Sequence, residues 1–326
     1  MIETLSYSKI KTLDTCSFLF YCRYILNLPE ESNTGAKLGT VLHELVEILS
    51  NRGKYEKLVT DIKYKTYPPS LNRLIKRKLK KQDILNDENF ESVQSFLTIA
   101  VTHDFWMEGS TESHTEKEFK ISFGKIFLKG FIDKIGIYGD TNNRFAIIRD
   151  FKSQKNRFTE AEMEYPIQAL MYMYAAKKMF PDIILAKSRV EFILLRYPED
   201  PLQVVQGYND DTINGFGYYL EDLVKFLLKF NEAKAKGNYA KNDKKKTWLC
   251  GFCSKPGELK KNGEKKWHCL YRFPFDYYAI KNKDNKVIRT SKDKLELESK
   301  LSEGEKIVKE KFLGCPAWAP RDDFNF

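Results

Sequence analysis

The chain has 326 residues, of which 42% are hydrophobic and 31% are charged, so it can bury a sizeable core and is not a disordered protein. Lysine and arginine outnumber aspartate and glutamate by 55 to 45, and this net charge of +10 favours a polyanionic partner, nucleic acid first. No apolar run approaches the roughly 20 residues of a membrane span, and the polar start excludes a secretory signal. Six cysteines without an export signal indicate a reducing, cytoplasmic location.

The first third of the sequence predicts helices. Residues 8–28 carry spaced apolar side chains with few breakers, and a second amphipathic helix is expected to begin at Gly39. Residues 70–107 also favour helix, and their first part, residues 70–82, is strongly basic. This basic stretch is either a solvated helix face or a face that contacts phosphates.

From Thr115 the hydrophobic period changes to two, which predicts strands. The residues GDTNN suit a tight hairpin turn between the second and third of these strands. The lysine-rich residues 231–246 are low in apolar side chains and favour a linker or a mobile loop. An α/β core of modest size follows from this order. The elements expected from here on are strands at residues 118–123, 126–138, 144–153 and 188–197, helices at 166–180 and 211–235, and tail strands at 275–280 and 286–290.

Two aspartates lie on the predicted hairpin, and side-chain alternation gives each an apolar neighbourhood. Asp133 shares a strand face with Ile135, and Asp150 shares one with Ile148 and Lys152. An unpaired carboxylate on an apolar face costs several kcal/mol unless its charge is compensated. A divalent cation between the two carboxylates, with the lysine beside them, is one compensated arrangement. The alternative is a surface hairpin on which all three charged groups face water.

Three polar residues accompany these carboxylates. His43 lies within an apolar helical stretch, where a buried structural histidine is the alternative to a ligand. Its surroundings read HELVE and lack the second histidine of a zinc protease. Gln168 and Tyr172 lie one turn apart on the helix that follows the hairpin, where they either cap the core or line a site. The sequence contains no P-loop, so any unwinding would come from a helicase in trans.

The order of these motifs resembles the RecB/AddB branch of the PD-(D/E)XK nucleases, which includes the CRISPR-adaptation iron–sulfur exonucleases. The motifs are GTVLH at 39–43, GFID at 130–133, DFK at 150–152, Gln168 with Tyr172, and the opening SYSKIKTLDTC. The resemblance implies a restriction-endonuclease-like fold, in which a small mixed sheet is flanked by helices. It also implies an N-terminal helical region and a C-terminal cysteine-bearing segment.

The resemblance further implies a Mg²⁺- or Mn²⁺-dependent exonuclease that acts on single-stranded DNA or duplex ends in repair or recombination. The metal would be held by His43, Asp133, Asp150 and the carbonyl of Phe151. Lys152 would orient or deprotonate the attacking water. Gln168 and Tyr172 would line the site, and Glu118 offers a further carboxylate. Phosphodiester hydrolysis needs a polarising metal and a cation near the developing charge, which agrees with this residue set.

The cysteines suggest a second metal centre. Cys250 and Cys253 form a CxxC pair whose thiolates can reach one metal. In the resembling branch, one early cysteine and three late ones hold a [4Fe–4S] cluster, which implies Cys16, Cys250, Cys253 and Cys269 here. The gap before Cys269 is longer than the family's and also suits a zinc site with His268 or Cys22 as a competing ligand. No role is assigned to Cys22 and Cys315.

The sequence therefore predicts four consecutive parts: a helical part (residues 1–110), a nuclease core (111–235), a cysteine segment (236–275) and a C-terminal extension of unknown role (276–326). Two alternatives to a nuclease are considered. One is a nucleic-acid-binding module with a structural zinc site and inert carboxylates. The other is an inactive protein that retains the nuclease fold, which the intact Asp133, Asp150 and Lys152 disfavour.

Overall fold

The computed structural model of the chain describes residues 2–30, 33–164, 166–251, 255–261, 263 and 265–318. The chain divides into two compact units, which we call the sheet unit (Ser32–Leu223) and the terminal unit (Met1–Glu31 with Val224–Phe326). This division rests on packing alone. The four parts expected from the sequence were defined by function, and they stay a prediction. Among the described helices, none is both long and apolar enough to cross a membrane.

The sheet unit is built around a mixed sheet. Its strands pair in the order β2-β3-β4-β5-β6, and every neighbouring pair is antiparallel except β4 and β5, which are parallel. The strands predicted from period-two alternation are confirmed, and β2 begins six residues earlier than expected. The strands are β2 (Glu112–Phe123), β3 (Ile126–Tyr138), β4 (Phe145–Lys152), β5 (Arg189–Leu194) and β6 (Leu202–Val205).

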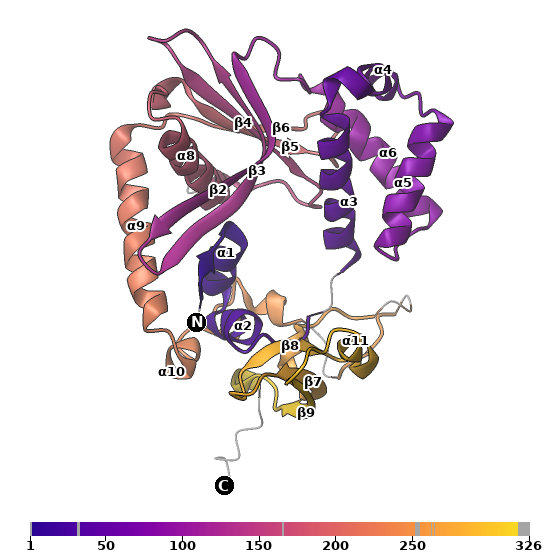
Figure 1. Cartoon of the computed structure of the whole chain (residues 1–326), viewed down its shortest axis with the longest axis vertical. Coiled ribbons are helices and arrows are strands. Elements are labelled where there is room, and N and C mark those ends of the chain that lie inside the picture. The colour runs from indigo at the N-terminus through magenta and orange to yellow at the C-terminus, as the bar shows by residue number, and fades with distance from the viewer. Residues whose placement is uncertain are drawn as a thin grey trace. The chain divides into compact units, whose positions relative to one another are not determined.

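Helices flank this sheet (Figure 1). A bundle of α3 to α6 shares one apolar core with side chains of β4 and β5, such as Phe151 and Ile193. Helix α8 packs separately, against β5 and β2. The mixed sheet with helices around it is the fold class that the sequence predicted. The helices of this unit are α3 (Thr34–Leu49), α4 (Arg52–Lys63), α5 (Pro69–Lys81), α6 (Asp87–Thr102), α7 (Glu160–Glu164), α8 (Ile167–Met179) and α9 (Asp210–Leu228, up to Leu223).

Asparagine caps set helix bounds that hydrophobic periodicity alone misses. Helix α3 begins at Thr34 instead of Gly39, because the side chain of Asn33 accepts a hydrogen bond of 2.9 Å from the backbone N–H of Ala36. The helix expected over residues 70–107 is two helices, since the Asn86 side chain caps α6 in the same way. Both caps satisfy backbone donors that the first helical turn leaves unpaired.

Two glycine turns fix the register of the first three strands. Gly124 and Lys125 join β2 to β3, and the φ of Gly124 is +66°. Gly139 follows β3 with a φ of +85°, and a Cβ atom there would collide with the carbonyl oxygen of Asn143. Because a hairpin turn sets which residues face each other, these turns determine what lies opposite the aspartates of β3 and β4.

The terminal unit joins the two ends of the chain. The helix expected over residues 8–28 is interrupted at Cys16, whose extended backbone separates α1 from α2 and a π-helical turn. The segment 231–246, expected to be a linker, contains a short helix, α10, whose residue Ala235 is fully buried. The hydroxyl of Ser17 donates a hydrogen bond of 2.8 Å to the carbonyl of Ala235 and so joins the two ends of the chain. Elements of this unit are β1 (Thr4–Leu5), α1 (Tyr7–Thr15), α2 (Ser17–Phe20), α10 (Glu232–Ala235), β7 (Phe275–Lys281), β8 (Val287–Ser291), α11 (Lys294–Glu298) and β9 (Lys306–Phe312).

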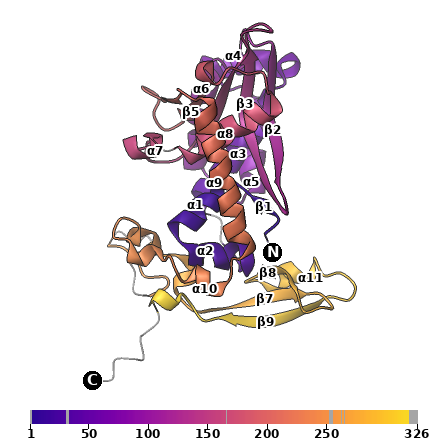
Figure 2. The same cartoon turned by 90° about the vertical axis from the view of Figure 1, so that its left-hand side faces the viewer.

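The tail of the chain forms a small antiparallel sheet of its own, in the order β8-β7-β9 (Figure 2). Its first two strands match the strands expected at residues 275–280 and 286–290, and β9 is an addition that the sequence analysis missed.

The two hairpin glycines make a matched test of backbone strain. Gly139→Ala combines a positive φ with a collision against backbone, so we expect it to lower the free energy of unfolding by about 2–3 kcal/mol. Gly124→Ala has the positive φ but nothing within 4 Å of its Cβ, so about 1 kcal/mol is expected. Urea unfolding followed by fluorescence measures both, and equal losses would contradict this account.

Candidate active site

The two aspartates of the hairpin are buried side by side. Lys134 of β3 pairs with Arg149 of β4, so Asp133 and Asp150 occupy the next position along this antiparallel pair. Their exposed fractions are 5% and 2%. The alternative of a surface hairpin with solvated charges is therefore wrong, and both carboxylates need partners inside the protein.

Asp133 is held by a backbone donor and approached by a histidine. Its Oδ2 accepts a hydrogen bond of 2.8 Å from the backbone N–H of Phe151, and its Oδ1 lies 3.5 Å from Nδ1 of His43. Burial, followed by the charge of Asp150, raises the pKa of Asp133 to about 7, against the opposing effect of His43 and Lys152. A cation close to this carboxyl group would stabilise its ionised form, which burial and the charge of Asp150 disfavour.

Asp150 is held by helix α8 and by its own strand. Its Oδ1 accepts hydrogen bonds from the hydroxyl of Tyr172 at 2.7 Å and from the Nε2 amide of Gln168 at 2.9 Å. Its Oδ2 lies 2.7 Å from the ammonium of Lys152. Burial and then the charge of Asp150 raise the pKa of Tyr172 well above its usual range, which keeps the phenol a donor. The helix thus fixes the orientation of this carboxylate.

His43 projects from α3 toward the aspartates and toward a carboxylate of β2. Its Nδ1 lies 3.5 Å from both Asp133 Oδ1 and Glu116 Oε1. Burial lowers its pKa, but the charge of Asp133 and the contact with Glu116 outweigh this and raise it to about 9. Ligand atoms of His43, Glu116 and Asp133 all lie within 4.8 Å of one another, a spacing that one metal ion can bridge. Asp150 is outside this set of three.

Glu116 is a candidate residue that the sequence analysis missed. The sequence predicted Glu118 instead, and the carboxylate of Glu118 forms an ion pair of 2.8 Å with Lys129. The signal was present in the β2–β3 turn: counting back from Gly124 and Lys125 places Glu116 opposite Asp133, between two regular pairs of the ladder. Residues opposite each other point to the same sheet face. The turn therefore brings both carboxylates together.

Two buried cations lie next to the aspartates along the same two strands. The ammonium of Lys134 donates to the carbonyl of Phe105 at 2.7 Å, and the guanidinium of Arg149 contacts Glu191 at 2.6 Å. Burial, and next the charge of Arg149, lower the pKa of Lys134 to about 7. Neighbouring residues of each strand thus carry opposite charges into the protein interior.

A family model decides the relationship of the chain. Residues 4–256 match the model of the PD-(D/E)XK nuclease superfamily, which is more than half of the chain and contains every candidate residue of this site. The chain belongs to the PD-(D/E)XK nuclease superfamily. Members of this superfamily are metal-dependent phosphodiester hydrolases, so the chain is identified as a nuclease that uses divalent metal.

The comparison with solved structures gives weaker similarities to this nuclease. A protein from Eubacterium rectale that carries the name "Putative exonuclease" is 13% identical with a TM-score of 0.44, over 78% of this chain and 90% of that one. A protein named SSO0001 is 15% identical with a TM-score of 0.24, over 62% of this chain and 89% of that one. Neither similarity carries an argument about activity. None of the curated proteins matches the chain in sequence.

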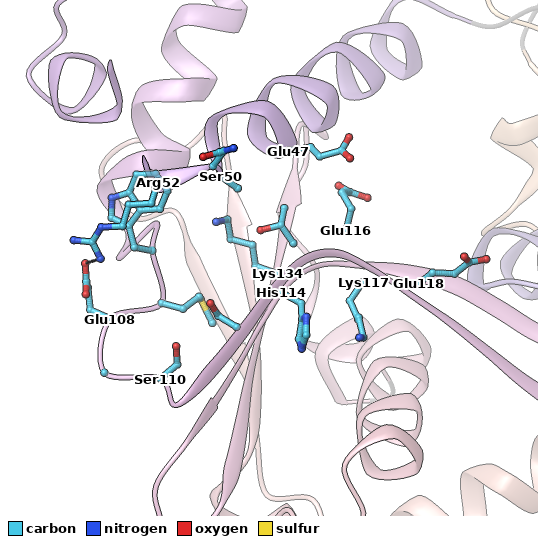
Figure 3. A pocket seen from close by; sticks show the side chains of 16 residues that line it. Glu47, Ser50, Arg52, Glu108, Ser110, His114, Glu116, Lys117, Glu118 and Lys134 are labelled. Atoms are coloured by element: carbon cyan, nitrogen blue, oxygen red, sulfur yellow. Dashed lines mark ion pairs between the residues drawn. The ribbon is translucent and has the colours of Figure 1, made fainter. Parts of the chain in front are cut away.

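Two cavities lie between α3 and β2, and Glu116 lines both of them. The first, with a volume of about 720 Å³, is also lined by Glu47, His114 and Lys134 among others (Figure 3). The second, of about 460 Å³, is also lined by Gly39 and His43. The sequence GTVLH thus contributes both part of the wall of the second cavity and the histidine in it.

The cysteines predicted to hold an iron–sulfur cluster belong to the terminal unit of the nuclease. Cys16, Cys250 and Cys269 gather in one apolar cluster, and Cys22 and Cys315 join them there. All five are free thiols. Cys253 lies outside the described residues. His268, the competing zinc ligand, has a buried Nδ1 without a hydrogen-bond partner among the described residues.

Glu116 and Glu118 provide a paired test of the metal site. We expect Glu116→Gln to weaken Mn²⁺ binding about tenfold or more, because a charged ligand within reach of His43 and Asp133 is lost. Glu118→Gln, which removes only a carboxylate paired with Lys129, should bind Mn²⁺ like the wild type. Isothermal titration calorimetry measures both affinities, and equal effects of the two changes would remove Glu116 from the site.

Proposed function

We propose that this nuclease is a Mg²⁺- or Mn²⁺-dependent deoxyribonuclease of the RecB/AddB type that degrades DNA from an end. The observation that carries the proposal is the buried pair Asp133 and Asp150, with Lys152 at 2.7 Å and His43 at 3.5 Å. Paired carboxylates that bind metal and an adjacent lysine are what phosphodiester hydrolysis requires. The similarity of the motif order to the CRISPR-adaptation exonucleases supports cutting from an end.

The donor set fits a divalent ion. Glu116 Oε1 is buried and meets no donor at hydrogen-bond geometry among the described residues, so it is available as a ligand. We propose that His43, Asp133 and Asp150 hold the ion together with the carbonyl of Phe151, and that Glu116 adds a further carboxylate. A bound ion would polarise a phosphoryl oxygen and lower the pKa of the attacking water.

The remaining residues act on the substrate and on the carboxylates. Lys152 places an ammonium at the edge of the buried pair, where it can stabilise the negative charge that develops on the phosphate and orient the water. Gln168 and Tyr172 each donate to Oδ1 of Asp150, and so hold that carboxylate in one orientation. Because their side chains line the same buried face, they also limit how a DNA strand can enter.

Removing the lysine tests the enzymatic proposal. We expect Lys152→Ala to lower the rate of DNA cleavage at least about a hundredfold, because a cation at the developing charge is lost. Lys63→Ala, at the exposed end of α4, is the control and should cleave like the wild type. The assay uses end-labelled linear DNA and covalently closed circular DNA with Mg²⁺ or Mn²⁺.

The outcomes of this assay separate the proposed functions. Degradation of linear DNA alone supports an exonuclease, whereas cutting of closed circles would identify an endonuclease. If the wild type cut neither substrate and still bound DNA, the non-catalytic binding module would replace the enzymatic proposal. Activity that survives Lys152→Ala would remove this lysine from the mechanism.

The exposed basic face of α5 is proposed to contact DNA phosphates. Lys76, Arg77 and Lys80 are exposed, while the apolar face of the helix is buried through Ile75 and Leu79. We propose that the lysine-rich residues 233–246 add further contacts. A helicase would be the partner that supplies single strands in a cellular setting.

Salt dependence tests the basic face. Replacing Lys76, Arg77 and Lys80 together by alanine should reduce the slope of log affinity against log salt by about 2–3, since each phosphate contact releases counterions. The control replaces three exposed lysines of α4, namely Lys54, Lys57 and Lys63, and should leave the slope unchanged. Fluorescence anisotropy with labelled single-stranded DNA measures the slope, and an unchanged slope in the α5 variant would refute the contact.

We further propose that the cysteines of the terminal unit hold a structural [4Fe–4S] cluster, with zinc as the alternative. Support comes from the gathering of Cys16, Cys250 and Cys269 in one apolar cluster, although the first two lie 234 positions apart in the sequence. Thiolates from distant segments on one centre would fasten those segments together. Free thiols and a reducing, cytoplasmic location are consistent with this centre.

A further inference from the structure

The C-terminal extension brings one more cysteine to the thiol cluster than the predicted ligand set contains. Cys315 packs in the same apolar cluster as Cys16, Cys250 and Cys269. It lies three residues after β9, in a part of the chain that the sequence analysis left without a role. Together with Cys22, which also packs there, the cluster has five thiols among the described residues.

A series of backbone hydrogen bonds places Cys315 beside the other cysteines. The N–H of Cys269 donates to the carbonyl of Cys250 at 3.1 Å, and the N–H of Arg272 donates to the carbonyl of Cys269 at 3.0 Å. The N–H of Cys315 then donates to the carbonyl of Arg272 at 3.4 Å. Gly314 has a φ of +92° and packs against the backbone from Arg272 to Pro274, which a Cβ atom on residue 314 would approach to 3.2 Å. The approach is thus built into main-chain geometry.

The turn that follows Cys315 contacts a second cysteine. Trp318 forms a hydrogen bond with the side chain of Cys250. The guanidinium of Arg272 lies 3.8 Å from the Trp318 ring centroid, and the ammonium of Lys241 lies 4.4 Å from it. Two cations and an N–H donor near the sulfurs are suited to stabilise thiolates.

Cys22 is the cysteine of the cluster that suits a ligand least. It is fully buried on the π-helical turn. Cys315 is partly exposed, and its backbone N–H bonds to the segment that carries Cys269. This difference makes Cys22 a control within the same cluster.

We propose that Cys315 is a ligand of the cysteine-held metal centre, in a set with Cys16, Cys250 and Cys269. The inference rests on the proposed metal centre, and it is independent of the nuclease site. Its consequence is that the C-terminal extension is not an appendage. The extension completes the ligand set, and the small sheet β7–β9 carries the residue into place.

Metal content measures the role of Cys315 directly. The full-length protein is purified without oxygen, and iron, acid-labile sulfide and zinc are quantified with a visible absorption spectrum. We expect Cys315→Ser to lower the metal content about tenfold or more, because a thiolate ligand is lost. Cys22→Ser should keep the wild-type content and spectrum. Iron with sulfide identifies a cluster, and zinc alone identifies the zinc centre.

A labelling experiment on the wild type covers the case in which Cys315→Ser fails to fold. We expect iodoacetamide to leave Cys315 unmodified in the metal-loaded protein and to modify it once a chelator has removed the metal, as read by mass spectrometry of peptides. Modification of Cys315 in protein that retains its full metal content would overturn the proposal.

The other outcomes are distinguishable. A loaded wild type together with a fully loaded Cys315→Ser variant overturns the assignment of Cys315 alone. Loss of metal in Cys253→Ser with retention in Cys315→Ser does the same, in favour of the original ligand set. Loss in Cys315→Ser alone supports the proposal, whereas loss in both variants overturns the set of four, because Cys253 would then be a ligand as well. A wild type without iron or zinc refutes the centre itself, and Cys315 with it, while DNA cleavage can still be present.

Discussion

The burial of two carboxylates on neighbouring strands is the constraint on which the rest of the sheet unit depends. Asp133 and Asp150 lie at the same level of β3 and β4 with almost no exposure. Leaving either charge without a partner would cost several kcal/mol, because a buried ion keeps its desolvation penalty when its partner is removed. The partners come from a backbone N–H of β4, a histidine of α3 and two side chains of α8. The positions of both helices are thus tied to the carboxylates.

Strands β3 and β4 also carry buried cations beside the aspartates. Lys134 and Arg149, one residue along each strand, are buried as well. Such strands would be unstable in a two-layer protein with one solvated face, because each strand needs partners on both faces. Here the α3–α6 bundle and α8 flank the sheet. The buried ion pair of Arg149 with Glu191 compensates one of these positive charges and links β4 to β5.

Much of this arrangement could be predicted from the sequence, because it follows from local periodicity. Alternation gave the strands and the shared face of the aspartates, and a spacing of four placed Gln168 and Tyr172 together. Glu116 was missed because its place depends on register, which is set by the turn at Gly124 and not by the residues around it. Short motifs pointed to the superfamily only when taken in order.

What could not be predicted depends on contacts between distant segments. The break at Cys16 accompanies hydrogen bonds of Ser17 with residues more than 200 positions away. The lysine-rich segment 231–246 was taken for a linker because it is polar, yet its small residues Ala235 and Ala240 are buried in the thiol cluster. Cys315 has no local pattern around it that suggests a partner. In each case the deciding neighbour is remote in sequence.

The terminal unit takes its residues from both ends of the chain, and this has a consequence for biosynthesis. Residues 32–223 form one compact unit, while Cys16 and Ser17 meet partners such as Ala235, Cys250 and Cys269 only after residue 224 has been made. During that interval Cys16 has only Cys22 of the clustered cysteines nearby in the chain. A premature stop soon after codon 224 would leave the first cysteines without these partners, a species suited to recognition by chaperones and proteases.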